Sequence, residues 1–267
     1  MSALALLLVA VGLSDLVATR PWRDEHTGRR VGAVTGLLSI AVLGMLAGLD
    51  AWGDLALLAL AGATTGAWVV LAGRADDNAQ GEGLALAALA AGGALTLLLS
   101  GLASPVDGAL ASWMDWTGID VLGGADPTRV LLLAGLLLTQ LSTGNVVVRL
   151  ALAHTGALDP RGGPQASDRL RGGRLLGPME RVFILGLGLA GQVTAASIVI
   201  AAKGLIRWPE LQRASRDTER RDVEARASGE VAPRPLASID QITEYFLIGS
   251  FVSWLVALTA LVLAHLA

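Results

Sequence analysis

Two cations and an amide recur at even spacing in one apolar segment of the chain. Arg181, Gln192 and Lys203 are eleven residues apart. In a continuous α-helix eleven residues make about three turns, so the three side chains would share one face. A charged side chain at the middle of a bilayer costs roughly 2.5–3.5 kcal/mol on insertion scales, and therefore needs a partner or a function. The spacing predicts a polar face on this segment.

Further polar residues extend this candidate site. Glu180 and Arg181 form an acid–base pair where the segment begins, and Glu244 with Tyr245 opens the last apolar segment, where a counter-charge is available. Lys203 is the only lysine in a chain otherwise strongly biased towards arginine. The candidate residues are Glu180, Arg181, Gln192, Lys203, Arg207, Glu244, Tyr245 and Asn145. These side chains either anchor helix ends at the membrane interface and hold neighbouring helices together, or they line a path or a binding site for a solute.

Residue combinations typical of enzymes are missing from the sequence. The chain has no cysteine, and its three histidines have no second ligand at a metal-binding spacing. Neither a Gly-x-Ser-x-Gly elbow nor a His–Glu helix motif occurs. Gly186, Gly188 and Gly191 match a dinucleotide fingerprint, but no second strand-like segment follows to build a nucleotide-binding fold. We therefore expect no catalytic residue, no metal and no cofactor.

The composition indicates that lipid, rather than water, surrounds much of the chain. Of its 267 residues 53% are hydrophobic and 16% are charged, whereas a soluble domain averages about a quarter charged residues. The formal net charge is −3. These values exclude a disordered chain and a nucleic-acid binder, and the lack of cysteine excludes a disulfide scaffold.

Apolar windows long enough to cross a bilayer recur along the chain. A span needs about 20 mostly apolar residues. The windows are 3–19, 31–49, 52–73, 83–103, 129–153, 181–203 and 242–266. We expect an all-α, polytopic membrane bundle of six or seven spans, in which the first window is a retained helix and not a signal peptide. Its N-terminal region, 1–128, has four spans and an extracytoplasmic loop at 104–128, and its C-terminal region, 129–267, has a charged arm at 204–241.

The arginines orient this bundle but contradict one span. Basic loops stay on the cytoplasmic side, which places loops 20–30 and 154–180 inside and the acidic loop 104–128 outside. A crossing at 181–203 would put the arm 204–241 outside, although it contains seven arginines. Either this charged arm is translocated, or the segment enters the membrane and returns, with a break around Gly186, Gly188, Gly191 and Gln192.

Tryptophans and a surface helix mark the predicted membrane boundaries. Trp22, Trp52, Trp113, Trp116 and Trp208 all fall at or near predicted span ends, where an indole ring suits the headgroup zone. Inside the acidic loop, apolar residues from 106 to 117 recur every three to four positions, which predicts a short helix on the membrane surface. Trp68 and Trp254 lie inside spans, and we interpret them as packing residues.

Four stretches of the C-terminal region resemble a known family. They read GGRLLGPMERVFIL (172–185), LAGQ (189–192), IAAKGLIRW (200–208) and EYFLIGSFVS (244–253). They are similar to the GxLER, GQ, AAKSxxRF and EYxLIGTxxS pattern of bacterial multi-pass membrane proteins catalogued only as a domain of unknown function. The matching positions are Glu180, Arg181, Gln192, Lys203, Arg207, Glu244, Tyr245, Gly249 and Ser253.

The resemblance covers about residues 129–267 and departs from the pattern at a few positions. Gly204 stands for the usual Ser, Trp208 for Phe and Ser250 for Thr, and the Pro178–Met179 pair replaces a Leu before the glutamate. Residues 1–128 lack the family's opening pattern. The resemblance implies a polytopic bacterial protein of the cell membrane, and it implies no activity.

From these observations we expect a membrane component with a structural or partner-binding role. Its partners would be the lipid bilayer and either another membrane protein or further copies of itself, and not nucleic acid. The alternative is a transporter or channel for a small solute or ion that uses the polar residues named above. Internal repeats, which would favour a transporter, are not found.

Overall fold

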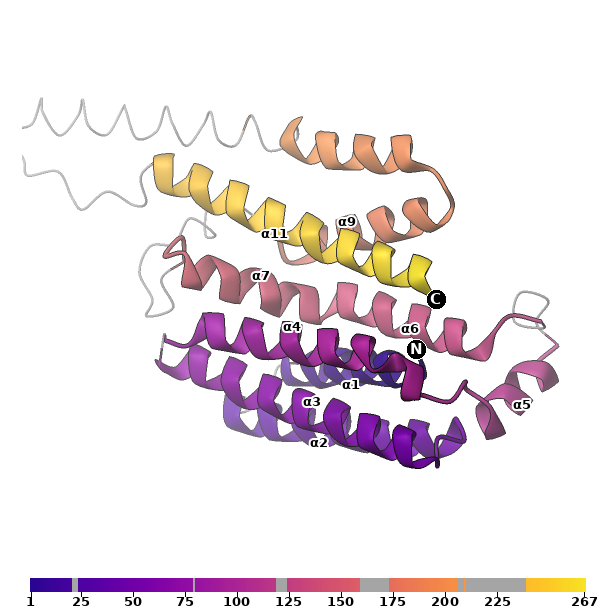
Figure 1. The fold of residues 1–267 in the computed structure, drawn as a ribbon. Coiled ribbons are helices and arrows are strands. Elements are labelled where there is room, and N and C mark those ends of the chain that lie inside the picture. The colour runs from indigo at the N-terminus through magenta and orange to yellow at the C-terminus, as the bar shows by residue number, and fades with distance from the viewer. Residues whose placement is uncertain (21–23, 79, 119–123, 159–172, 206–208, 210–238) are drawn as a thin grey trace, which may run out of the picture.

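The computed structural model describes residues 1–20, 24–78, 80–118, 124–158, 173–205, 209 and 239–267. Within these ranges every regular element is a helix and none is a strand, which confirms the all-α prediction. The N-terminal region contains α1 (Ser2–Ala18), α2 (Glu25–Leu46), α3 (Trp52–Asn78) and α4 (Glu82–Leu98), and these helices lie roughly antiparallel along the chain (Figure 1). A short 3₁₀ turn, η1 (Ser100–Leu102), follows α4.

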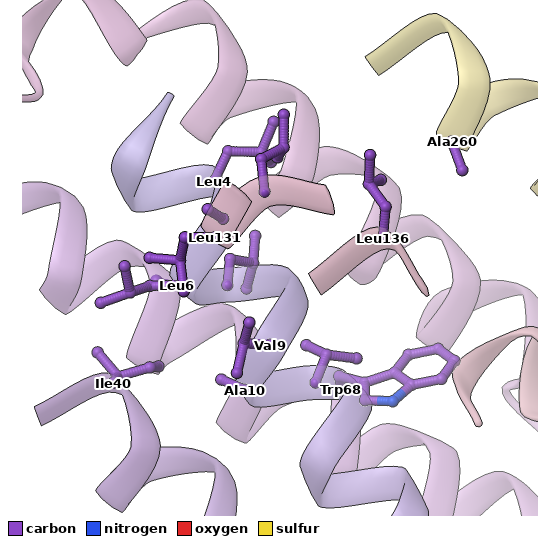
Figure 2. Close-up of a cluster of buried hydrophobic side chains, with 14 of the residues drawn as sticks. Leu4, Leu6, Val9, Ala10, Ile40, Trp68, Leu131, Leu136 and Ala260 are labelled. Atoms are coloured by element: carbon purple, nitrogen blue, oxygen red, sulfur yellow. The ribbon is translucent and has the colours of Figure 1, made fainter. Parts of the chain in front are cut away.

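Helix α1 forms the centre of the N-terminal region. It contacts α2, α3 and α6, and its side chains at Leu4, Leu6 and Leu7 are all at most 2% exposed. A helix that is apolar on every side buries every side, which explains its central place. Figure 2 shows this core, where Ile40 of α2 and Leu131 of α6 approach the same helix.

Glycines allow the main chains of α1 and α2 to approach closely. A Cβ at Gly32 would lie 2.6 Å from the main-chain oxygen of Ser14, and one at Gly36 would lie 2.9 Å from that of Ala10. Small residues that let helix backbones meet replace the hydrophobic drive in lipid-like surroundings. The spaced glycines of this window therefore have a packing role at these two positions.

The C-terminal region contains an interrupted helix and a helical hairpin. After the surface helix α5 (Gly108–Trp116), α6 (Pro127–Leu141) and α7 (Thr143–His154) follow each other with a bend of 46°. Then come α9 (Gly173–Leu189), a helix over Val193–Leu205, and α11 (Ile239–Leu266). Helix α5 matches the short helix that was predicted in the acidic loop, with Met114 buried and Trp116 exposed.

The segment 181–203 reverses direction and does not form one helix. Gly191 adopts a left-handed φ of 72°, and the main-chain N–H of Gln192 donates to the oxygen of Leu187 at 2.8 Å, which ends α9. The chain then runs back, so that Lys203 on the returning helix lies 2.6 Å from Glu180 on α9. The segment therefore has the shape of a helical hairpin.

Several described helices have the length and composition of membrane spans. His26–Leu46, Trp52–Asn78 and Thr243–Leu266 are each long and apolar enough to cross a membrane, and the bent pair α6–α7 would be a fourth span. Ser2–Ala18, Glu82–Leu98 and Val193–Leu205 are apolar but shorter. These helices indicate a membrane protein, because only lipid can solvate so much exposed apolar surface.

The bundle has two distinct ends, which are visible in Figure 1. At the first, which we call the salt-bridge end, α1, α3 and α7 end and α2 and α4 begin. The second, which we call the α5 end, holds α5, the hairpin turn at 190–192 and the C-terminus of α11. From the hairpin turn, α9 and the helix over Val193–Leu205 both extend towards the salt-bridge end.

Candidate functional site

Arg181 is the most deeply buried charged side chain of the hairpin, with 1% of its surface exposed. Its Nε and Nη2 donate to the main-chain oxygen of Gln140 at 3.1 and 2.9 Å. Nη2 also donates to Oδ1 of Asn145 at 2.7 Å, and Nη1 donates to Oγ of Ser253 at 3.2 Å. One guanidinium therefore joins α9 to α6, α7 and α11.

The interruption between α6 and α7 creates the acceptor that Arg181 uses. Ser142 has φ −118° and ψ −72°, so the helix stops at Leu141 and restarts at Thr143. The last carbonyls of a helix lack partners and carry the negative end of its dipole, which favours a cation there. Gly144 leaves room for that cation, because a Cβ at this position would lie 2.6 Å from Nε of Arg181.

Glu180 joins the two arms of the hairpin to α11. Its carboxylate is buried; Oε1 accepts from Nε1 of Trp254 at 2.5 Å, and Oε2 lies 2.6 Å from Nζ of Lys203. The ammonium of Lys203 also lies 5.9 Å from the centroid of the Trp254 ring, within cation–π range. Phe251 packs edge-on against the same indole.

These contacts define a closed polar cluster in the C-terminal region. We call it the hairpin cluster; it comprises Gln140, Asn145, Glu180, Arg181, Lys203, Ser253 and Trp254. Glu180 forms an ion pair with Lys203, whereas Arg181, which the neighbouring Glu180 charge also attracts, donates its hydrogen bonds to neutral oxygens. The cluster lies near the middle of the interrupted helix, with α6 of 15 residues before the break and α7 of 12 residues after it.

The structure brings together four of the eight candidate residues, namely Asn145, Glu180, Arg181 and Lys203. The other four candidate residues are not part of the hairpin cluster as the structure describes it. Gln192 is exposed at the hairpin turn. A face shared by Gln192, Arg181 and Lys203 required one continuous helix, and the helix ends at Gly191, so the three side chains do not share a face.

The residues expected to supply the counter-charge, Glu244 and Tyr245, lie further along α11. Glu244 is exposed and Tyr245 is half-buried, and both lie about 12–14 Å along α11 from Ser253. Glu180 supplies the counter-charge instead. Arg207 lies outside the described residues, as do Trp22 and Trp208.

Sequence reasoning missed or misjudged three members of the hairpin cluster. Trp254 is more than a packing residue, since its indole N–H binds a carboxylate. Gln140 contributes its main-chain oxygen, and its own amide donates weakly to Leu136 O at 3.4 Å. Ser253 was matched by the family pattern alone, which was the one signal that could have identified it.

A second buried polar group lies between α1, α3 and α7. Asp15 is 7% exposed, and Nε1 of the fully buried Trp68 lies 3.1 Å from each of its carboxylate oxygens. The hydroxyl of Thr143, the first residue of α7, lies beside the same carboxylate. A single acid within the apolar window 3–19 was the sequence signal for this group, and it was overlooked.

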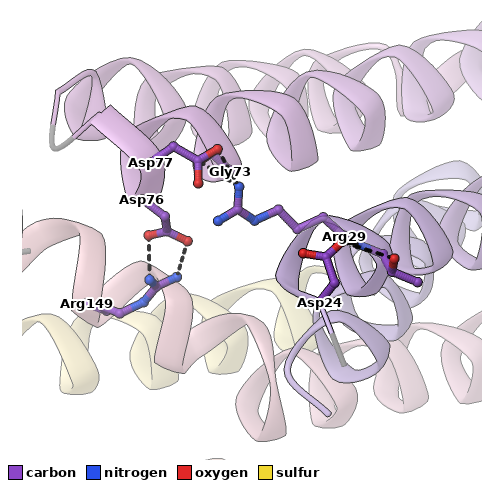
Figure 3. Close-up of polar contacts among 7 residues, drawn as sticks. Asp24, Arg29, Gly73, Asp76, Asp77 and Arg149 are labelled. Carbon is purple, nitrogen blue, oxygen red and sulfur yellow. Dashed lines mark hydrogen bonds and ion pairs between the residues drawn. The ribbon is translucent and has the colours of Figure 1, made fainter. Parts of the chain in front are cut away.

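Two ion pairs join the helices at the salt-bridge end (Figure 3). Arg149 of α7 binds the carboxylate of Asp76 on α3 through two nitrogens. Arg29 of α2 donates to Oδ2 of Asp77 at 2.7 Å and to the main-chain oxygen of Gly73 at 3.1 Å. These pairs are partly exposed and tie α2 and α7 to the end of α3.

Neither polar group resembles a metal centre or a substrate pocket. In the part of the chain that the structure describes, no three His, Cys, Asp or Glu side chains gather closely enough to hold a metal ion. A hollow of about 310 Å³ lies at the α5 end, lined in part by Met1, Ser104 and Asp126, away from the hairpin cluster. The hairpin cluster joins α6, α7 and α11 to both helices of the hairpin.

Comparison with known proteins adds no assignment to this geometry: no family model, no curated protein and no solved structure matches the chain.

Proposed function

We propose that this chain is a multi-pass protein of the cell membrane with six spans and one re-entrant hairpin. The spans would be α1, α2, α3, α4, the interrupted pair α6–α7, and α11. The hairpin formed by α9 and Val193–Leu205 would enter from the salt-bridge end and return to it. Irregular backbone at membrane depth is tolerated only inside protein, and the hairpin cluster supplies the polar contacts that such a segment requires.

The charge distribution supports this topology. With the hairpin returning, loops 20–30 and 154–180 and the arm 204–241 all belong to one side, and the acidic loop 104–128 belongs to the other. The positive-inside rule then holds for every arginine-rich segment, which it did not for a seven-span chain. The exposed Trp52, Trp113 and Trp116 mark the opposite, outer boundary.

Within that topology we propose a structural or partner-binding role. The carrying observation is that the charges of the hairpin cluster have partners inside the protein: Glu180 with Lys203 and Trp254, and Arg181 with three oxygens. Charges that are paired in this way would fix the hairpin, and would thereby fix where the charged arm 204–241 leaves the membrane. Partners would be lipid and either another membrane protein or a second copy of the chain.

Replacement of Lys203 tests this role. Lys203→Ala leaves the Glu180 carboxylate buried with only Trp254, so we expect loss of folded protein and of monodispersity in detergent, measured by size-exclusion chromatography. Lys203→Arg, which keeps the charge, is the matched control and should retain most of the folded fraction. A Lys203→Ala protein as stable and as well assembled as the wild type would contradict the structural role.

A transporter or channel for a small solute or ion is the second candidate. One observation favours it: an interrupted helix and a hairpin meet near the middle of the bundle, and discontinuous helices build the midplane sites of many secondary transporters. The discriminating result is a Lys203→Ala protein that stays folded in proteoliposomes but loses a solute or ion flux that the wild type shows. Equal flux in both would exclude the hairpin cluster from transport.

A further inference from the structure

The carboxylate of Asp15 is a buried charge without a cationic partner. Within the described ranges no Lys, Arg or His nitrogen lies within ion-pair distance of it. The neutral groups beside its carboxylate are Nε1 of Trp68, at 3.1 Å from each oxygen, and the hydroxyl of Thr143. Figure 2 shows the indole of Trp68 lying against α1 in the apolar core. An isolated carboxylate in such surroundings is expensive unless a cation or a proton neutralises it.

The neighbouring charges do not supply this neutralisation. Arg149 of α7 and Asp76 of α3 are the charged groups that act on Asp15, and they are bonded to each other as an ion pair. Neither α2 nor α6, which pack closely on α1, places a charged side chain among those that act on Asp15. The net charge around Asp15 therefore remains negative.

A metal ion fits this position poorly, whereas a proton fits it well. Hard cations such as Mg²⁺ and Ca²⁺ take six or more oxygen ligands, and an indole N–H directed at both carboxylate oxygens occupies the side where a metal would bind. Thr143 can serve either protonation state of this carboxyl group, because its Oγ1 is buried beside Asp15 and makes no hydrogen bond to any other group within the described ranges. It can accept a hydrogen bond from a carboxylic acid and can donate one to a carboxylate.

We propose that Asp15, hydrogen-bonded through Thr143 and Trp68, is a proton-binding site in the interior of the bundle. On protonation, one O–H bond forms at an Asp15 oxygen with a proton taken from water at the salt-bridge end. The new hydroxyl donates to Oγ1 of Thr143, and the indole N–H of Trp68 keeps the other oxygen as its acceptor. The proposal rests on α1, α3 and α7 and is independent of the hairpin cluster.

Infrared difference spectroscopy on the full chain in lipid tests it. Between alkaline and acidic buffer the wild type should gain the C=O stretching band of a protonated carboxylic acid that Asp15→Asn lacks. Asp76→Asn is the matched control and should keep this band, because it removes a nearby acid but leaves Asp15, Trp68 and Thr143 in place. Thr143→Val should keep the band but shift its frequency, since the hydroxyl acceptor is lost.

Two results would overturn the proposal. An identical set of carboxylic-acid bands in the wild type and Asp15→Asn would mean that Asp15 does not exchange a proton. Loss of the Asp15 band on adding Na⁺ at fixed pH would mean that a metal cation occupies the position. If Asp15→Asn fails to fold, the frequency shift in Thr143→Val decides, and an unshifted band contradicts the proposal.

Discussion

The N-terminal and C-terminal regions of this protein hold their helices together by different means. In the N-terminal region the helices α1 to α4 are continuous, and α1 and α2 meet through glycines whose main chains almost touch. In the C-terminal region the chain is interrupted at Ser142 and at Gly191, and buried charges surround the first interruption. In a continuous helix the main-chain N–H and C=O groups bond to each other, so close packing of the surfaces is enough to hold the helices together. An interrupted helix in an apolar environment leaves main-chain groups unpaired, and polar side chains must bind them.

The interruption between α6 and α7 receives opposite charges on its two sides. Arg181 binds the carboxyl end of α6, and the carboxylate of Asp15 lies beside Thr143 at the amino end of α7. Both placements follow the helix dipole, which favours a cation at the first end and an anion at the second. The break is thus a feature that two other helices stabilise, and it links the two regions of the molecule.

The largest effect should come from the ion pair of the hairpin cluster. Glu180→Gln keeps an acceptor for Trp254 but leaves Lys203 and Arg181 as uncompensated neighbouring cations. Removing one partner of a buried pair costs about 3–5 kcal/mol, so the free energy of unfolding in mixed micelles should fall by about that amount. Adding Lys203→Met should recover a large part of the loss. Strict additivity of the two substitutions would contradict the pairing.

A smaller effect is expected where the N-terminal helices touch. In Gly32→Ala the new Cβ would meet the main-chain oxygen of Ser14, which cannot move without moving α1. Overpacking of this kind costs about 1–3 kcal/mol. Gly66→Ala is the matched control, because nothing lies within 4 Å of its Cβ and alanine is the better helix former. If thermal unfolding shows equal stability for both variants, close backbone approach does not hold α1 to α2.

The smallest effect should come from the salt-bridge end. Asp77→Asn removes the partner of Arg29, and Asp77 is 42% exposed in this pair. Exposed ion pairs contribute about 0.2–1 kcal/mol and are weakened by salt. The stability difference from the wild type should therefore shrink as the ionic strength is raised. A salt-independent loss of several kcal/mol would place this pair with the hairpin cluster in importance.

The sequence predicted the positions of the helices better than the side-chain contacts between them. The windows 3–19, 31–49, 52–73, 83–103 and 242–266 each overlap one described α-helix, because the length and composition of a segment suffice for that. The windows 129–153 and 181–203 each overlap two helices. Arg181, Lys203 and Glu180 were found because charge inside an apolar window is rare. A shared face at eleven-residue spacing required a continuous helix, and Gly191 ends that helix. The arginine-rich arm had raised the hairpin as an alternative, because its charge conflicted with a crossing.

The remaining misses have a common physical cause. The oxygen bound by Arg181 belongs to the main chain of Gln140, and no residue pattern indicates which carbonyl an interruption leaves free. Trp68 and Trp254 appear as apolar residues in a sequence window, although each indole N–H binds a carboxylate from another helix. Such pairs join positions more than 50 residues apart, and a single sequence does not reveal them.

Cysteine accessibility at position 220 tests the central claim of this account most directly. The natural chain has no cysteine, so Arg220→Cys introduces one reporter, with Arg74→Cys marking the salt-bridge end and Asp115→Cys marking the α5 end. A membrane-impermeant thiol reagent added to intact cells should label Asp115→Cys only, and Arg220→Cys should react together with Arg74→Cys after the membrane is opened. Labelling of Arg220→Cys together with Asp115→Cys in intact cells would mean that 181–203 crosses the bilayer, and the re-entrant hairpin would be wrong.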